Sequence, residues 1–226
     1  GDENVVIGFE AGDAITSQGA ITLIGKSSGS AINDNAANGT VAIGKSSLGA
    51  LTSGAGNTAI GYSSMSAQTD GEHNTVIGFS AFDAADSGES NNVVIGSGAA
   101  GAMNTATCDN NVIIGKDAGV GGVATLAGCV AIGAASLTAT GNIGASDSVF
   151  IGKDSGGGSW STAGCDNNTA IGAGTLAGAM NGAAHNVAVG KSALAAITTG
   201  DNNVAVGMQA GTNFDAEIYN TFVGAY

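Results

Sequence analysis

The chain has 226 residues and a formal net charge of −13, with five lysines and no arginine. This charge disfavours nucleic acid, whose recognition depends on lysine and arginine, and it equally disfavours an anionic membrane surface. Glycine occurs 40 times and proline never, yet 43% of the residues are hydrophobic, which argues against a disordered linker. No apolar run approaches the ~20 residues that cross a membrane as a helix. The opening Gly1-Asp2-Glu3 predicts a segment cut from a longer protein.

One tetrapeptide recurs along the whole chain: Val or Thr, an apolar residue, Ile or Val, and then Gly. Its 13 copies lie 17 to 20 residues apart. The first and third positions are β-branched, which is typical of strands. We therefore expect short strands, in chain order, within residues 5–8, 22–25, 41–44, 58–61, 75–78, 93–96, 112–115, 130–133, 149–152, 169–172, 187–190, 204–207 and 221–224. No gap holds another domain, so residues 1–226 are expected to form one β-solenoid of about 13 coils.

The second residue of every tetrapeptide is also apolar, so each strand is apolar on both faces. A strand of this kind is buried on both faces. One face can line the interior of the coil, and the other needs a neighbour, most simply a second copy of the chain. We expect the second residue to lie in that interface. The interface residues predicted in this way are Ala42, Ala59, Ala131, Ala170, Ala188 and Ala205.

The columns continue on either side of the strand. After the glycine, small residues alternate with larger ones such as Leu48 and Phe82, which predicts a second short strand over a thin core. Four residues before the glycine, asparagine stands in nine of the 13 copies and is expected to form a hydrogen-bonded ladder. All five lysines directly follow the glycine, a position that we expect to be half exposed.

Residues 57–61 (Asn-Thr-Ala-Ile-Gly), 186–194 (Asn-Val-Ala-Val-Gly-Lys-Ser-Ala-Leu) and 200–207 (Gly-Asp-Asn-Asn-Val-Ala-Val-Gly) resemble two related families. One comprises bacteriophage tail-fibre proteins with repeats of the NTAIGxxAL type, and the other is the head of trimeric autotransporter adhesins. The resemblance implies a left-handed parallel β-roll assembled as a parallel homotrimer. The longer period favours the phage family, which implies a virion tail fibre that attaches to a host surface receptor or glycan.

Other functions remain as alternatives. A bacterial surface adhesin fits the same repeat, and a polysaccharide-degrading spike would use paired carboxylates. The acidic residues are spread thinly and the aromatic platforms of a sugar cleft are lacking, so we expect no enzyme. An ice-binding solenoid would need a flat threonine array, which this chain lacks. Candidate receptor contacts are Lys26, Lys45, Tyr62 and Trp160, although Trp160 equally fits a cap between coils.

Several motifs have simpler explanations than a cofactor site. Residues 39–46 match the phosphate-loop pattern, but the repeat strand occupies the place of the loop. Asp166-Asn167-Asn168 offers oxygen ligands for calcium, yet turn and ladder chemistry explains it as well. His73 and His185 are expected in solvated loops. Cys108, Cys129 and Cys165 leave two alternatives: one stacked disulfide between the first two, or three buried thiols. We therefore expect no cofactor.

Overall fold

A computed structural model describes residues 3–121, 125–138, 144–160 and 164–225. The chain is an all-β, parallel β-solenoid of about 12 turns, close to the number of coils expected. It consists of two compact units, Gly1–Asn110 and Asn111–Tyr226, which are treated separately below. Among the described residues, one strand belongs to each of the 13 tetrapeptides, in the places that the repeat predicts.

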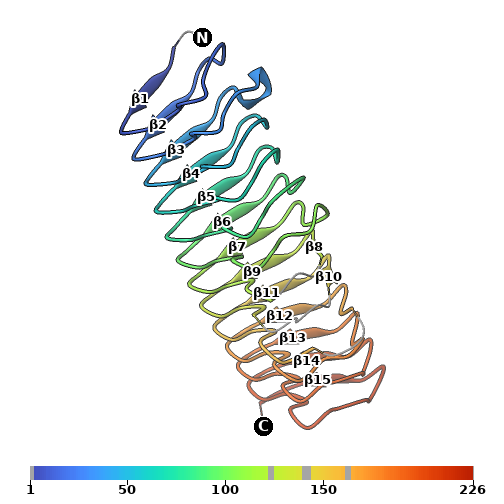
Figure 1. Ribbon diagram of the computed structural model, residues 1–226. Coiled ribbons are helices and arrows are strands. Elements are labelled where there is room, and N and C mark those ends of the chain that lie inside the picture. The colour runs from blue at the N-terminus through green and yellow to red at the C-terminus, as the bar shows by residue number, and fades with distance from the viewer. Residues whose placement is uncertain (1–2, 122–124, 139–143, 161–163, 226) are drawn as a thin grey trace. The chain divides into compact units, whose positions relative to one another are not determined.

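The first unit stacks six of these strands in sequence order, each parallel to the next (Figure 1). The register places each copy directly on the equivalent residues of the next, so that Ile43 pairs with Ile60 and Ile60 with Ile77. One short 3-10 helix, η1, lies in a loop of this unit. The elements are β1 (Val5–Ile7), β2 (Thr22–Ile24), η1 (Asn35–Ala37), β3 (Val41–Ile43), β4 (Thr58–Ile60), β5 (Thr75–Ile77) and β6 (Val93–Ile95).

The second unit repeats this stack with seven strands, β7, β9, β11, β12, β13, β14 and β15, again parallel and in register. A further pair, β8 and β10, forms a small parallel sheet six to seven residues before the repeat glycines Gly133 and Gly152. The bounds are β7 (Val112–Ile114), β8 (Leu126–Ala127), β9 (Val130–Ile132), β10 (Ala145–Ser146), β11 (Val149–Ile151), β12 (Thr169–Ile171), β13 (Val187–Val189), β14 (Val204–Val206) and β15 (Thr221–Val223).

The chain turns at the repeat glycine. The prediction of a second short strand after this glycine is wrong. In the described coils a run of turns follows the glycine, because the residues two and four positions after it take left-handed backbone, as at Ser46 (φ 58°) and Leu48 (φ 49°). These turns still bond from coil to coil: Ser46 N–H donates to Lys26 O at 2.9 Å, and Leu48 N–H donates to Ser64 O at 3.1 Å.

The core of each coil lies between the strand and these turns, and it is as thin as the small residues predict. Leu48, Met65 and Phe82 fill it in the first unit, and Leu137 and Leu194 fill it in the second, all fully buried. The second residue of the strand faces the same interior and is buried from β2 to β14. Apolar burial at ~25 cal/mol per Å², repeated in every coil, is the main force that holds the stack together.

The asparagine column forms the ladder that the sequence predicts. In the first unit, Asn74 Nδ2 donates to Asn57 Oδ1 at 3.2 Å, and Asn92 Nδ2 donates to Asn74 Oδ1 at 3.1 Å. The second unit continues in the same way through Asn168, Asn186, Asn203 and Asn220. The oxygen of each asparagine also accepts the backbone N–H of the next, as Asn74 Oδ1 does from Asn92. The ladder therefore provides hydrogen-bond acceptors for buried backbone N–H groups that would otherwise have no partner.

Candidate functional site

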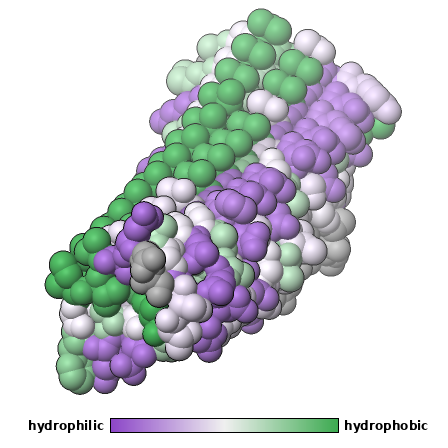
Figure 2. Space-filling model, turned by 90° about the horizontal axis from the view of Figure 1, so that it is seen from above, coloured by the Kyte–Doolittle hydropathy of each residue, from purple (hydrophilic) through white to green (hydrophobic). Residues whose placement is uncertain are grey.

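The outward face of the strands carries two columns of β-branched residues, which we call the outer columns: Ile or Val one position before each repeat glycine, and Val or Thr three positions before it. Ile77 is 37% exposed, Ile171 40% and Val206 38%, whereas the residues between the two columns are fully buried from β2 to β14. Figure 2 shows hydrophobic side chains gathered into a strip beside hydrophilic ones. Exposed apolar patches of this kind commonly mark interaction surfaces.

The alanines predicted to contact a partner chain lie on the opposite face. Ala42, Ala59, Ala131, Ala170, Ala188 and Ala205 have no exposed surface in the single chain. Their assignment to an interface is therefore wrong, because the interior of their own coil already covers them. The alternation of strand side chains was predicted correctly, but the two faces were exchanged.

The lysine position, directly after the repeat glycine, differs between coils. In the second unit, Lys116 and Lys153 each form an ion pair with the aspartate that follows, Asp117 and Asp154. In the first unit, Lys26 and Lys45 are followed by serines instead. Both ammonium groups lie over aromatic rings of neighbouring coils.

These residues form one column in the first unit, named here the aromatic–lysine ladder: Phe9, Lys26, Lys45, Tyr62 and Phe79. Lys26 Nζ lies 5.3 Å from the centroid of the Phe9 ring, and Lys45 Nζ lies 5.3 Å from that of Tyr62. The Tyr62 and Phe79 rings are stacked, with centroids 5.2 Å apart and planes 12° apart. Three of the predicted receptor contacts, Lys26, Lys45 and Tyr62, therefore lie in one ladder. Phe9 and Phe79 are not among the predicted receptor contacts, although they directly follow the repeat glycines Gly8 and Gly78, as the lysines follow theirs.

Trp160, the fourth predicted contact, belongs to the second unit and is only 5% exposed. Its ring packs against Phe150, with centroids 5.9 Å apart. A buried indole cannot meet a receptor at the surface, so this prediction is wrong and the alternative, a cap on the coil interior, fits. Within the described chain the indole N–H has no hydrogen-bond partner.

A carboxylate is buried in the core of the first unit. Glu89 has no exposed surface, and the side-chain amide of Gln68, also fully buried, donates to Glu89 Oε2 at 3.0 Å. The amide oxygen of Gln68 accepts from Gly71 N–H at 2.6 Å. Burial raises the pKa of Glu89, and the negative charge of Asp86 raises it further, while hydrogen bonds from the backbone oppose them.

The structure contains the three cysteines as buried thiols, the second of the two alternatives. Burial raises the pKa of both Cys129 and Cys165 to about 11. Since the thiolate is the nucleophile, neither thiol is activated for covalent chemistry near neutral pH.

Polar loop residues serve the stacking of coils. Asp166 Oδ1 accepts from Ser146 N–H at 2.8 Å, and Asn168 belongs to the ladder, so the group considered for calcium has structural contacts. His73 and His185 are exposed, and both take left-handed backbone (φ 57° and 58°). In the described part of the chain, no three His, Cys, Asp or Glu side chains cluster as metal ligands, and no helix is long and apolar enough to span a membrane.

The phosphate-loop-like stretch is a strand and corner, as expected. Strand β3 (Val41–Ile43) occupies its centre, and Gly44 is pressed against Gly61: a Cβ on Gly44 would lie 2.2 Å from the Gly61 carbonyl oxygen. No nest of backbone N–H groups is open to a phosphate there, since Gly44 N–H and Ser46 N–H donate to the preceding coil.

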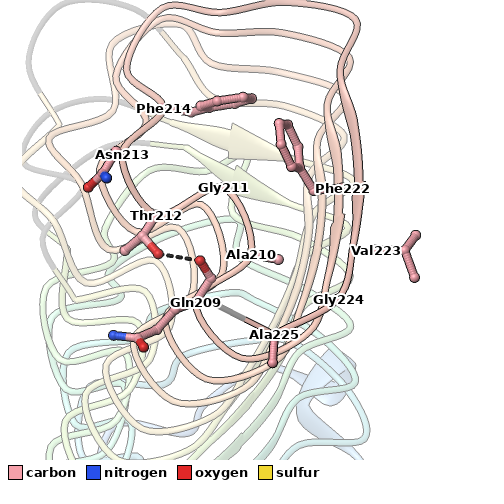
Figure 3. Close-up of a pocket in the computed structure, with 10 residues that line it drawn as sticks. All are labelled: Gln209, Ala210, Gly211, Thr212, Asn213, Phe214, Phe222, Val223, Gly224 and Ala225. Atoms are coloured by element: carbon pink, nitrogen blue, oxygen red, sulfur yellow. Dashed lines mark hydrogen bonds between the residues drawn. The ribbon is translucent and has the colours of Figure 1, made fainter.

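A pocket of about 480 Å³ lies at the last coil of the second unit (Figure 3). The rings of Phe214 and Phe222 meet edge to face, with centroids 4.5 Å apart, while Val223 points away. The equivalent positions one coil earlier, Ile197 and Ala205, are fully buried. The pocket is therefore the apolar coil interior, uncovered at this coil, and not a site with converging polar groups.

No protein-family model matches the chain, and no curated protein matches it either.

Proposed function

We propose that this chain is a structural segment of a trimeric fibre, such as the shaft or head of a phage tail fibre, that takes part in attachment to a host cell surface. The observation that carries the proposal is the pair of outer columns, which leaves one apolar strand face uncovered in each unit. A second and a third copy of the chain, bound through these columns, would complete the burial. The same proposal includes a left-handed coil and a location on a virion, both of which the resemblance implies.

Two further features support a fibre over an enzyme. Side chains that elsewhere serve catalysis are engaged in stacking here, as with Asp166, or are buried with a raised pKa, as with Cys129 and Cys165. The repeated in-register coils suit a rod that extends by adding identical units. A bacterial surface adhesin would use the same columns and remains the second candidate.

The mass of the purified 226-residue chain in solution, by light scattering, tests the assembly. A mass near three times 21.4 kDa is expected. A monomer at micromolar concentration would contradict the trimer. The attachment role has a separate test, in which the fluorescently labelled chain is incubated with a panel of bacterial strains. Adsorption to some strains and not to others is expected. Adsorption to none would refute the attachment role, and the chain would then serve only as a spacer in the fibre.

A further inference from the structure

The aromatic–lysine ladder is a cationic strip on a strongly acidic protein. Lys26 and Lys45 are exposed, they occupy adjacent coils, and no carboxylate within the described residues forms an ion pair with either. The nearby carboxylate of Glu10 accepts a hydrogen bond from Ser27 Oγ at 3.0 Å. Lys116 and Lys153, at the same position in the second unit, are instead neutralised by Asp117 and Asp154. Lys191 also forms no ion pair among the described residues, but Ala173 and Met208 occupy its position in the neighbouring coils. Lys26 and Lys45 are therefore the two lysines of adjacent coils that lack a carboxylate partner and can bind an anion together.

The Tyr62 ring of the ladder presents its edge to solvent. Tyr62 is stacked between Phe79 on one side and the Lys45 ammonium on the other, so both of its faces are occupied. Phe9 is 69% exposed, Tyr62 46% and Phe79 60%. The edge of an aromatic ring carries partial positive charge, so ring edges and ammonium groups together offer one electrostatic sign to a ligand.

The backbone under the ladder is closed to an added peptide strand. The carbonyl oxygens of Phe9, Lys26, Lys45 and Tyr62 each accept an N–H from the next coil at 2.9 Å. Because strand addition needs free backbone groups, recognition here must use side chains. Two lysines are also too few for nucleic acid or for an anionic membrane, which need larger clusters of basic residues.

We propose that the aromatic–lysine ladder binds a carboxylated polysaccharide along the coil stack. Lys26 and Lys45 pair with carboxylates of successive sugars, because stacked coils repeat at ~4.8 Å, a spacing comparable to one sugar residue. The positive edge of the Tyr62 ring contacts oxygen atoms of the sugars, and the exposed Phe9 and Phe79 rings lie at the two ends of the ladder. The proposal rests on the attachment role given above, and it names the chemistry of the surface that is bound.

Calorimetric titration of the whole chain with oligogalacturonate of about ten sugars tests the proposal. Fully methyl-esterified oligogalacturonate and polyglutamate serve as comparison ligands. Binding to the carboxylated sugar is expected, with affinity that falls as salt rises, since exposed charges are screened. Equal binding of the neutral ester, equal binding of polyglutamate, or no binding to any ligand would overturn the proposal.

Paired variants locate the site. Lys26→Ala with Lys45→Ala is expected to weaken oligogalacturonate binding about tenfold, the scale of two exposed ion pairs. Lys116→Ala with Lys153→Ala removes the same charge from the same repeat position and should change the affinity less than about twofold. If the alanine pair alters the circular dichroism spectrum, Lys26→Gln with Lys45→Gln replaces it in the titration, because glutamine removes the charge and keeps most of the aliphatic side chain. An equal loss in both pairs would show a general charge effect and refute the ladder.

The mass of each variant separates this proposal from the fibre. If the ladder variant falls from trimer to monomer, the ladder contacts another copy of the chain and the proposal fails. Specific oligogalacturonate binding by a monomeric wild-type chain would keep the ladder and refute the trimer. A trimer that adsorbs to cells yet ignores oligogalacturonate would keep the fibre and refute the ladder.

Discussion

Asn186 shows how one side chain joins neighbouring coils. Its Nδ2 donates to Asn168 Oδ1 at 3.2 Å and to Gly200 O at 2.8 Å, while its Oδ1 accepts from Asn203 N–H at 2.9 Å. A buried polar group that loses its partner keeps the full cost of desolvation. Asn186 therefore pairs two backbone groups of the next coil and the side chain of the asparagine in the preceding coil.

Replacing Asn186 with alanine is expected to lower the free energy of unfolding by about 2–4 kcal/mol, because it strands several buried donors and acceptors. Asn220→Ala is the matched control: this residue is half-buried, so water can replace the lost bonds. Urea denaturation followed by circular dichroism measures both. Equal losses would mean that the ladder bonds contribute nothing specific.

Glu89 makes the stability of the first unit depend on pH. Because burial raises its pKa above the ordinary 4.5, the folded state holds the proton more tightly than the unfolded state. Its contribution to stability is therefore complete below the unfolded pKa and is lost as pH rises through the folded pKa. Glu89→Gln removes this loss and keeps a hydrogen-bonding group beside Gln68.

We expect Glu89→Gln to unfold at higher urea than wild type at pH 7, with the difference shrinking towards pH 4. Glu217 provides a control of opposite sign, since hydrogen bonds from the backbone, first that of Asp215, lower its pKa. Its contribution is present above the unfolded pKa and is lost as pH falls, so Glu217→Gln should not stabilise the chain at pH 7. A pH-independent difference for Glu89→Gln would argue against a buried carboxylate.

At the scale of the coil, the repeat glycine sets how closely neighbours approach. Gly207 has a φ of +135°, and a Cβ there would lie 2.2 Å from the Gly224 carbonyl oxygen. Gly224 has nearly the same backbone, with a φ of +141°, but nothing within 4 Å of its Cβ position. Substitutions at these two glycines therefore distinguish the cost of backbone strain, which both share, from the cost of a clash between coils, which only Gly207 would have.

Gly207→Ala is expected to lower stability by about 1–3 kcal/mol more than Gly224→Ala, the usual cost of overpacking. Thermal unfolding of the two variants side by side measures the difference. Equal effects would mean that the positive φ alone requires glycine.

The turns after the glycine explain why the second strand was not foreseen. Alternation of small and large residues there suits a strand, but Ser46 and Leu48 both take left-handed backbone. Leucine rarely adopts this conformation, so local preference favours the wrong structure. Bonds to the coils on either side stabilise the turn, as Ser46 N–H to Lys26 O and Leu48 N–H to Ser64 O illustrate.

At the scale of the molecule, the strand has one face for its own coil and one for a neighbour. Ala170 and Ile171 are adjacent in β12: the first has no exposed surface and the second is 40% exposed. A charge on the first enters the coil interior, where an unpaired ion is costly. A charge on the second changes only the outward face.

We expect Ile171→Asp to keep the circular dichroism spectrum of the wild type and to lower the mass towards 21.4 kDa. Ala170→Asp should instead lose folded structure or stability. Light scattering with thermal unfolding separates the two outcomes. An intact trimer from Ile171→Asp would remove the outer columns from the proposed interface.

The sequence by itself determined the position of every repeat strand, the register and the asparagine ladder, because these depend on local alternation and on a period that needs no tertiary knowledge. It could also group Lys26, Lys45 and Tyr62, which share one repeat position. It could not decide which strand face lies inside, since both faces are apolar. Only the tertiary structure decided that, because left-handed turns such as those at Ser46 and Leu48 return the chain over Ala42 and leave Ile43 outside.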